Sequence, residues 1–487
     1  MSGMYHRPVL IAIMAVGVRL VLIDQPFVDH WSWRQSDVAA IARNYFQGGF
    51  HFARPQIDWA GDQPGYVGTE FPILPFIAAL LYKLFAIHQW IGRIQGVILF
   101  AISLPFFFWL VRKRFGEIAA LWALFFYSFA PLGIMASRCF MPDMPSLALS
   151  IIGLYLFERW IEDENCKTAF IASALCISLS ILIKATTAII GVPLAFLAFQ
   201  RFRGSVFQRY SLWAFAGIAL LPSALWYWHA YEISQQFYPH HFFGAGGIKI
   251  MSIAWYWKIA RQIPMSTLTP AVFLLGCAGA VVSFSSSRAA PFQWWLVAMV
   301  LFIVIVGYGN RHPWYALPFV PIFAVFAGIA CDFVAKRISN RAVARAFTIA
   351  CVVTVIAPAA LYCRKLYEPT AGPMREAGLV LQQIAPLGAT LVAADNGDPT
   401  IFYYAERKGW HFTEHGGIFY GEPRDSRQGV MDLERLRKSG ATLLVFSSDT
   451  EWWLDYYREL GQYVSDNAEL VRSTSRFKIY KFKPVSG

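Results

Sequence analysis

The chain has 487 residues, of which 57% are hydrophobic and only 15% are charged. Soluble domains normally carry about 25% charged residues. The composition therefore excludes a disordered chain, a nucleic-acid-binding module and an ordinary soluble enzyme, and it indicates a polytopic membrane protein. The net charge of +12 lies entirely within the first 362 residues. A basic balance confined to a membrane region reflects orientation rather than nucleic-acid binding.

Apolar segments recur along the first 362 residues, and several are near the length of ~20 residues that a bilayer requires. They span residues 8–23, 91–111, 118–137, 144–161, 168–183, 187–200, 210–229, 267–285, 292–309, 314–332 and 343–362. We therefore predict an all-α polytopic membrane domain over residues 1–362 with about eleven transmembrane helices. Residues 71–87 are also apolar but contain Pro72, Pro75 and Lys83, which favours a helix in or dipping into the membrane interface.

The loops between these segments indicate the orientation. Clusters of Lys and Arg around Arg112, Arg203 and Arg337 all fall in cytoplasmic loops if the N-terminus is cytoplasmic. The first span lacks a small-residue cleavage site, so it does not read as a signal peptide. We expect an integral protein of a bacterial inner membrane. Its predicted extracytoplasmic regions are residues 24–90, the turn at 138–143, residues 230–266 and residues 363–487.

The C-terminal region alternates strand-like and helix-like patterns. Buried strands are predicted at 388–394 and 441–446, helices at 429–439 and 450–460, and a final strand at 475–482. We expect residues 363–487 to form an extracytoplasmic α/β domain.

Two acids stand out in the first outer loop. Residues 36–46 have an apolar face at helical spacing, which predicts an amphipathic interfacial helix beginning near Ser36 or Asp37. Asp37 is then either an N-cap or a carboxylate presented at the membrane surface. Asp29 follows a turn-like Gln25-Pro26, and it is either solvated or functional.

Further ionisable residues lie at the outer boundary of the apolar segments, where charges are expensive and tend to be functional. Arg138 and Asp143 either close their short turn as an ion pair or serve a site. Lys184 either snorkels to headgroups or binds a lipid phosphate. Glu70 and Arg311 are predicted on the same side.

Three carboxylates (Asp37, Glu70, Asp143) and three cations (Arg138, Lys184, Arg311) are thus expected on one membrane face. A carboxylate can deprotonate an attacking hydroxyl. Cations can hold a phosphate and neutralise a leaving group, and apolar walls can accept a prenyl chain. This combination suits transfer from a lipid phosphate.

We expect neither a metal nor another cofactor. Carboxylates can bind a divalent cation, but the first two outer loops contain no Asp-x-Asp, and the seven cysteines show no zinc spacing. His240 and His241 are weak ligand candidates that we interpret as a solvated loop pair. Asp395-Asn-Gly-Asp398 reads as a turn.

At these residues the sequence resembles the GT-C membrane glycosyltransferases of the protein O-mannosyltransferase and lipid A aminoarabinose transferase superfamily. The resemblance covers roughly residues 8–362 in layout. The segments that carry it are Trp33-Arg-Gln-Ser-Asp-Val-Ala-Ala-Ile-Ala-Arg-Asn44, Glu70-Phe-Pro-Ile-Leu-Pro75, Arg138-Cys-Phe-Met-Pro-Asp-Met-Pro145, Lys184-Ala-Thr and Arg311-His-Pro-Trp-Tyr-Ala-Leu-Pro318.

The resemblance implies roles for several residues. The acid of the first loop would be the catalytic base, and we prefer Asp37 to Asp29. Asp143 would position the acceptor or a cation, with Arg138 as its neighbour. Lys184 and Arg311 would bind the donor phosphate, with Tyr315 beside them in the substrate site.

The sequence departs from these relatives at two positions. They usually carry an Asp-Glu pair where Arg34 and Gln35 stand here, and often a Lys where Glu70 stands. Arg34 and Glu70 remain substrate-binding candidates, although Glu70 could instead orient Arg34 or the acceptor.

We therefore predict an inverting glycosyltransferase that uses a polyprenyl-phosphate-linked sugar. Its acceptor would be a hydroxyl of a lipid, a glycan or a protein, its other partners are membrane lipids, and no nucleic acid is involved. A transporter or lipid flippase is the competing class, but such proteins commonly show internal repeats and we find none. A scaffold with a sensory domain would explain the C-terminal region but not Arg138, Asp143 or Lys184.

Overall fold

The computed structural model describes residues 6–242 and 247–484. The chain forms two compact units. The first, which we call the helical unit, comprises Met1–Ile23, Arg93–Trp226 and Gly244–Arg364. The second, which we call the sheet unit, comprises Asp24–Gly92, Tyr227–Phe243 and Lys365–Gly487. The sheet unit therefore combines the first predicted outer loop with the C-terminal region.

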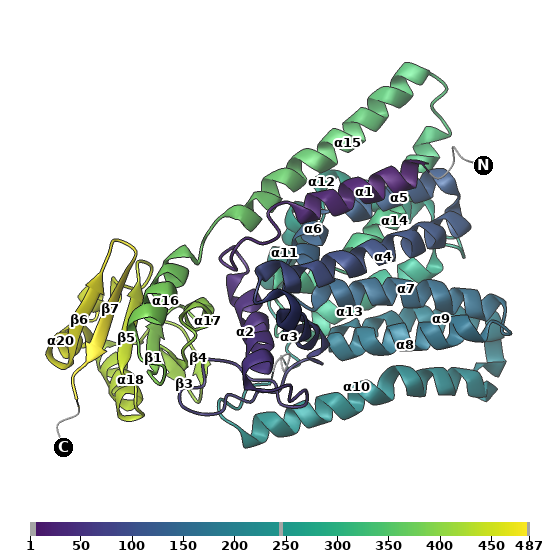
Figure 1. The fold of residues 1–487 in the computed structure, drawn as a ribbon. Coiled ribbons are helices and arrows are strands. Elements are labelled where there is room, and N and C mark those ends of the chain that lie inside the picture. The colour runs from purple at the N-terminus through teal and green to yellow at the C-terminus, as the bar shows by residue number, and fades with distance from the viewer. Residues whose placement is uncertain (1–5, 243–246, 485–487) are drawn as a thin grey trace. The chain divides into compact units, whose positions relative to one another are not determined.

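Apolar helices make up the helical unit (Figure 1). In chain order they are α1 (His6–Leu20), α4 (Gln89–Phe115, from Arg93 onward), α5 (Glu117–Phe129), α6 (Pro131–Arg138), α7 (Asp143–Glu162), α8 (Lys167–Ile183), α9 (Gly191–Phe202), α10 (Tyr210–Gln236, up to Trp226), α11 (Ile253–Gln262), α12 (Pro270–Val282), α13 (Ala290–Val306), α14 (Phe319–Ala335) and α15 (Arg341–Cys363). Each of the predicted apolar segments lies in helical elements of this series.

The predicted number of eleven transmembrane helices is not confirmed. Among the described residues, five helices are long and apolar enough to cross a membrane, or up to seven if each bent pair counts as one span. Helices α8 and α13 have only 17 residues each. Helices α5 and α6 meet at a bend of 57°, because Ala130 is extended and Pro131 begins a new helix.

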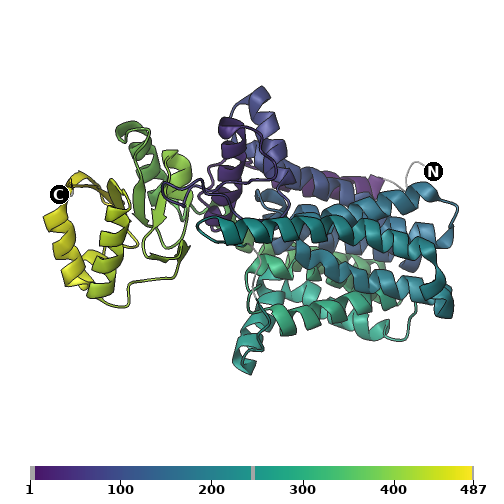
Figure 2. The same cartoon turned by 90° about the horizontal axis from the view of Figure 1, so that it is seen from below.

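Small residues bring the helices of this unit close together. Helix α7 packs on α8, and α14 packs on both α5 and α12. A Cβ atom added to Gly279 of α12 would lie 1.8 Å from the carbonyl oxygen of Phe326 in α14. Only glycine permits that approach, which is the way membrane helices commonly pack. Seen from below, α7, α8 and their neighbours again run alongside one another (Figure 2).

A mixed five-stranded sheet is the centre of the sheet unit. Its strands lie in the order β2 (Gly409–His411), β1 (Leu391–Ala394), β5 (Leu443–Ser447), β7 (Phe477–Phe482), β6 (Ala468–Ser473). Strands β2, β1 and β5 are parallel, whereas β7 is antiparallel to β5 and to β6. A short hairpin joins β3 (Glu414–His415) to β4 (Ile418–Phe419). The predicted strands at 388–394, 441–446 and 475–482 are confirmed.

Helices cover both faces of this sheet. Helices α16 (Gly372–Ile384) and α17 (Thr400–Ala405) pack on the face that includes Leu391 and Val445. Helices α18 (Ser426–Lys438), α19 (Trp453–Tyr456) and α20 (Arg458–Asn467) pack on the other face. The region is therefore a sheet-containing α/β domain. The predicted helix at 429–439 is present within α18, whereas the segment predicted as one helix at 450–460 contains the short α19 and the start of α20.

The first loop contributes to the same core. Helix α2 (Ser32–Gly48) places Ile41 and Tyr45 in one hydrophobic cluster with Leu391 of β1 and Ile401 of α17. Its apolar face is thus buried in the sheet unit and does not lie on a membrane surface as predicted. The predicted start at Ser36 or Asp37 is also wrong, because the helix begins at Ser32 after Trp31. Asp37 lies in the second turn and is not the N-cap.

The apolar stretch 71–87 contains a helix, as predicted, which is α3 (Ile73–Phe85). Pro72 precedes it at the position where a helix tolerates the ring. Helix α3 belongs to the sheet unit and packs on α2.

Candidate active site

Lys184 is a buried cation of the helical unit and one of the candidates that the sequence singled out. It lies between α8 and the 3-10 helix Ala185–Ile190. Its Nζ is 2.9 Å from Oδ1 of Asp143, the first residue of α7, and 4.5 Å from the centre of the Tyr315 ring. Both charged side chains are less than 10% exposed. The structure thus brings three predicted site residues together, and the ion pair joins Asp143 to Lys184, a partner that the sequence did not suggest.

Hydroxyl groups fix the backbone around Lys184. Thr187 donates from Oγ1 to the Lys184 carbonyl oxygen at 2.7 Å, and Ser146 donates to the Ser180 carbonyl oxygen at 2.9 Å. A cavity of about 20 Å³ is lined by Asp143, Lys184, Tyr315 and neighbouring residues, including Thr186 and Trp314. This volume has room for about one water molecule. The lysine is therefore held in place beside a small space that a polar group can enter.

The other two cations that the sequence analysis proposed for the site, Arg138 and Arg311, have different surroundings. Arg138, at the end of α6, donates from Nη2 to the carbonyl oxygens of Val21 and Leu22 at 2.7 and 2.6 Å. It therefore binds the backbone that follows α1. Arg311 is exposed, and its guanidinium carbon lies 5.7 Å from the centre of the Tyr308 ring. Arg311 does not line the cavity beside Lys184.

A larger apolar cavity of about 300 Å³ lies elsewhere in the helical unit. Helices α7, α8, α9 and α10 contribute the side chains around it, including Phe157, Ile177, Leu194 and Phe215. Its lining is almost wholly hydrocarbon and aromatic. Such a cavity suits an apolar chain rather than a polar ligand.

Arg34 and Glu70 form an ion pair in the sheet unit. Nη2 of Arg34 lies 2.7 Å from Oε1 and 2.9 Å from Oε2 of Glu70. Their side chains are 7% and 14% exposed. Thr69 donates a further hydrogen bond to Glu70. The geometry fits the interpretation that Glu70 orients Arg34.

Asp37 is buried, and Trp59 contacts it directly. Trp59 Nε1 donates to Oδ1 of Asp37 at 2.9 Å. Burial raises the pKa of Asp37 to about 6, although the Trp59 hydrogen bond and the charges of Arg34 and His411 oppose the rise. A carboxylate with this pKa is a stronger base than an ordinary aspartate and is still ionised at neutral pH.

Asp29 is buried as well, which excludes the solvated alternative of the sequence analysis. Its Oδ1 accepts from the Trp31 N–H at 3.0 Å, and both of its carboxylate oxygens accept from Nε2 of Gln35 at 2.9 and 3.0 Å. Its main-chain carbonyl oxygen accepts from the Ser32 N–H at 2.8 Å. Asp29 therefore organises the turn that starts α2, which is the usual work of an Asp before a helix.

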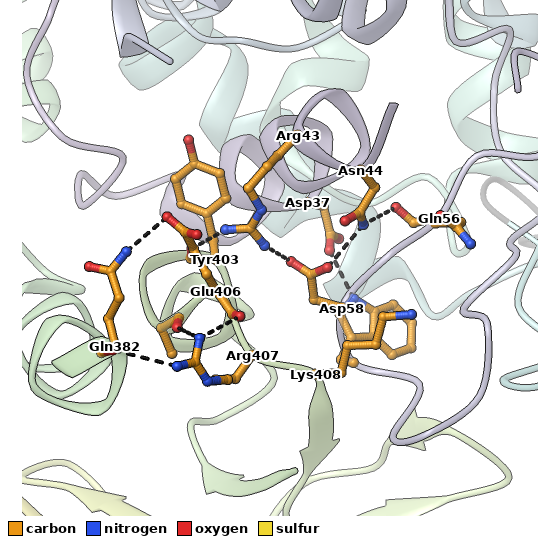
Figure 3. A network of polar contacts seen from close by, with 12 residues as sticks. Asp37, Arg43, Asn44, Gln56, Asp58, Gln382, Tyr403, Glu406, Arg407 and Lys408 are labelled. Atoms are coloured by element: carbon orange, nitrogen blue, oxygen red, sulfur yellow. Dashed lines mark hydrogen bonds and ion pairs between the residues drawn. The ribbon is translucent and has the colours of Figure 1, made fainter. Parts of the chain in front are cut away.

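Buried polar groups tie α2 to the C-terminal part of the same unit (Figure 3). Arg43 donates to the Asp58 carboxylate and to the Tyr403 carbonyl oxygen. Asn44 donates to Asp58 at 2.9 Å and to the Gln56 carbonyl oxygen at 2.9 Å. The hydrogen-bonded partners come from three separate stretches of sequence, so the position of Asp37 depends on all of them.

The sequence analysis missed one group of residues, the buried His411 and Asp395 and the partly buried Asp398. Nδ1 of His411 lies 2.9 and 2.8 Å from the two carboxylate oxygens of Asp395. Ser32 of α2 donates to Asp398 at 2.6 Å. The Asp395–Asp398 segment is indeed a turn, as predicted, with Gly397 N–H bonded to Asp395. The turn signal was correct, but it did not reveal that both acids face inward.

His240 and His241, the weak metal-ligand candidates of the sequence analysis, each have defined surroundings in the structure. Burial lowers the pKa of His241 to about 4, so its ring is neutral at pH 7. His240 bonds the Ser234 carbonyl oxygen through Nδ1 at 3.1 Å. Within residues 6–242 and 247–484, no group of three or more His, Cys, Asp or Glu side chains is arranged to hold a metal ion.

Comparison with known proteins points to one kind of fold. Residues 62–228 match the family of dolichyl-phosphate-mannose-protein mannosyltransferases. No curated protein sequence matches the chain significantly. The structure of ArnT from Cupriavidus metallidurans bound to undecaprenyl phosphate aligns with a TM-score of 0.66 and 16% identity, over 97% of each chain.

A second solved transferase also aligns. The oligosaccharyltransferase AglB of Archaeoglobus fulgidus, in complex with an inhibitory peptide and a dolichol-phosphate, aligns with a TM-score of 0.59 and 12% identity. The alignment covers 98% of this chain and 74% of that one. The helical arrangement, the C-terminal sheet and these matches together show that the chain has the GT-C glycosyltransferase fold, of the protein mannosyltransferase and ArnT type.

Proposed function

We propose that the protein is a membrane glycosyltransferase that moves a sugar from a polyprenyl-phosphate donor to an acceptor hydroxyl. The observation that carries the proposal is the buried Lys184, which is paired with Asp143 beside Tyr315 and a small cavity. Burying an ammonium ion costs desolvation free energy that a single ion pair only partly offsets. Its positive charge suits a phosphate ligand. Solved structures of the same fold contain undecaprenyl phosphate or dolichol-phosphate.

The reaction is a single displacement at the anomeric carbon. The acceptor oxygen attacks that carbon, its proton passes to the Asp37 carboxylate, and the bond to the phosphate oxygen breaks. The polyprenyl phosphate leaves with the electron pair, and its negative charge is balanced by Lys184. One displacement inverts the configuration of the sugar. The apolar cavity of about 300 Å³ is suited to part of the prenyl chain.

The basic clusters of the sequence support an orientation. We place the N-terminus in the cytoplasm and the sheet unit on the extracytoplasmic side of a bacterial inner membrane. The acceptor, which is a lipid, a glycan or a protein, would then be modified outside the cytoplasm. Residues 1–362 serve as the membrane catalytic domain and residues 363–487 as the appended domain in this proposal.

The test is a profile of lipid-linked sugars from cells with and without the gene, complemented by wild-type protein, Asp37→Asn or Asp29→Asn. We expect polyprenyl-phosphate sugar to accumulate in the deletion strain and with Asp37→Asn, and Asp29→Asn to restore the wild-type profile when the protein folds. A wild-type profile with Asp37→Asn would remove Asp37 as the base. An unchanged profile in the deletion strain, or reconstituted protein that moves lipid without forming a glycosidic bond, would favour the flippase.

A further inference from the structure

Trp59 contacts two histidines in the sheet unit. Its ring centre is 5.2 Å from that of His411 and 5.7 Å from that of His241. Its Nε1 donates to Asp37. His411 therefore packs on the same indole ring that donates to the carboxylate that we assign as the base.

The topology of the sheet explains how His411 and Asp395 meet. His411 is the last residue of β2 and is paired in register with Ala393 of the parallel strand β1. Asp395 follows the end of β1 directly. The carboxyl ends of parallel strands collect functional groups at one edge of a sheet. This edge also carries Asp398, which bonds Ser32 of α2.

The charge on His411 is set by its neighbours. Burial alone would lower the pKa of His411, but the charge and hydrogen bonds of Asp395, with Asp37 and Asp398 further away, outweigh burial and raise it. The rings of Phe402 and Phe419 cover other sides of the imidazole at 5.4 and 6.3 Å. The neighbouring acids thus favour the protonated form of the buried ring.

The charged groups that act on Asp37 come from several elements. Arg34 of α2 and His411 of β2 favour its ionised form, whereas Asp398 opposes it. The charge of Arg34 is permanent and is engaged by Glu70. His241, whose ring centre lies 5.7 Å from that of Trp59, is neutral at pH 7. Of the two favourable cations, His411 is the one whose charge can change with pH.

We propose that His411, which is hydrogen-bonded to Asp395 and packed on the indole ring that binds Asp37, is a positioning residue that favours the ionised form of the Asp37 carboxylate, the form that accepts the proton of the acceptor hydroxyl. The inference rests on the proposed function, in which Asp37 is the base. It assigns a role to the C-terminal domain, because His411 of β2 supplies a group that favours the ionised form of Asp37 in α2.

Two substitutions remove the charge while keeping the shape. His411→Asn keeps an N–H donor close to the place of Nδ1 but cannot be protonated. Asp395→Asn keeps the imidazole but removes the group that holds its proton. His415→Asn is the matched control, because His415 is exposed and lies only four residues along the same segment. Thermal unfolding of each purified full-length variant verifies that it is folded.

The first readout is the pH dependence of transfer. The donor is the lipid-linked sugar that accumulates in the deletion strain, and membranes of that strain supply the acceptor. We expect His411→Asn and Asp395→Asn to move the acidic limb of the rate upward by about one pH unit, which leaves about tenfold less ionised Asp37 below the midpoint. We expect no shift with His415→Asn. A folded His411→Asn protein with an unchanged midpoint would overturn the inference.

The second readout does not need activity. Infrared difference spectra over a pH titration follow the protonated carboxyl band of Asp37, which is assigned by its absence in Asp37→Asn. The inference predicts that the pH midpoint at which this band appears is raised by the same amount, about one pH unit, in both variants. If transfer itself is never observed, the proposed function fails while this titration still decides whether His411 controls Asp37. If either variant does not fold, the other supplies the result in both readouts.

Discussion

Arg34 and Glu70 form an ion pair in the sheet unit, with Nη2 of Arg34 at 2.7 Å from Oε1 and 2.9 Å from Oε2 of Glu70. Their side chains are only 7% and 14% exposed. Because both charges are largely withdrawn from water, each depends on the other for its stabilisation. The pair should therefore tolerate exchange of its two charges better than the loss of either one.

Exchange of the two charges tests this relationship. We expect Arg34→Asp or Glu70→Lys alone to lower the free energy of unfolding by about 3 kcal/mol, because each leaves two like charges buried. The double variant should recover most of that loss. Thermal or denaturant unfolding of the purified protein measures it. As a control, reversal of the much more exposed Arg476–Glu376 pair of the same unit should change stability by less than about 1 kcal/mol. Single variants as stable as wild type would contradict the prediction.

The pH dependence of transfer follows from the burial of Asp37. Because burial raises the pKa of Asp37 to about 6, the base loses its charge as the pH falls through about 6 and not through about 4. We expect the transfer rate to be constant above pH 7 and to fall about tenfold for each unit below 6. Initial rates under donor-limited conditions measure this. A midpoint near 4 would mean that an ordinary exposed carboxylate is the base.

Lys184 and Asp143 can be separated into structural and binding roles. Lys184→Met leaves Asp143 buried without its partner, and we expect this change to cost about 3 kcal/mol of stability. The double variant Lys184→Met, Asp143→Asn should restore stability, because neither side chain is then charged. If Lys184 binds phosphate, the double variant should still show a donor KM raised at least about tenfold. Recovery of both stability and KM would make the lysine purely structural.

Packing of the first loop on the C-terminal sheet can be tested by changing a residue of the C-terminal region and measuring hydrogen exchange in α2. Ile401 of α17 is fully buried in the cluster that includes Ile41 of α2. We expect Ile401→Ala to cost about 3 kcal/mol and to speed hydrogen exchange in α2, more than 350 residues earlier. Exposed Leu387→Ala is the control. Unchanged exchange in α2 with a destabilised C-terminal sheet would contradict a shared core.

Hydropathy and periodicity predicted the helical segments and the main strands because those features depend on local sequence. The number of membrane-spanning helices was harder to predict than their positions, because bends such as that at Ala130 depend on packing. The start of α2 was misplaced because Trp31 offers no capping side chain and Asp29 acts from outside the helix. His411 could not be found at all. It lies on a three-residue strand, and only the register with β1 brings it to Asp395.

The division of the sheet unit over distant stretches of sequence has a consequence for biosynthesis. Helix α2 is translated early, but the strands and helices that cover Ile41 and Tyr45 are among the last residues to leave the ribosome. Until then the first loop has no finished core, and Asp37 has no His411 or Asp398 near it. The surroundings of the proposed catalytic base are therefore complete only when synthesis of the chain is complete.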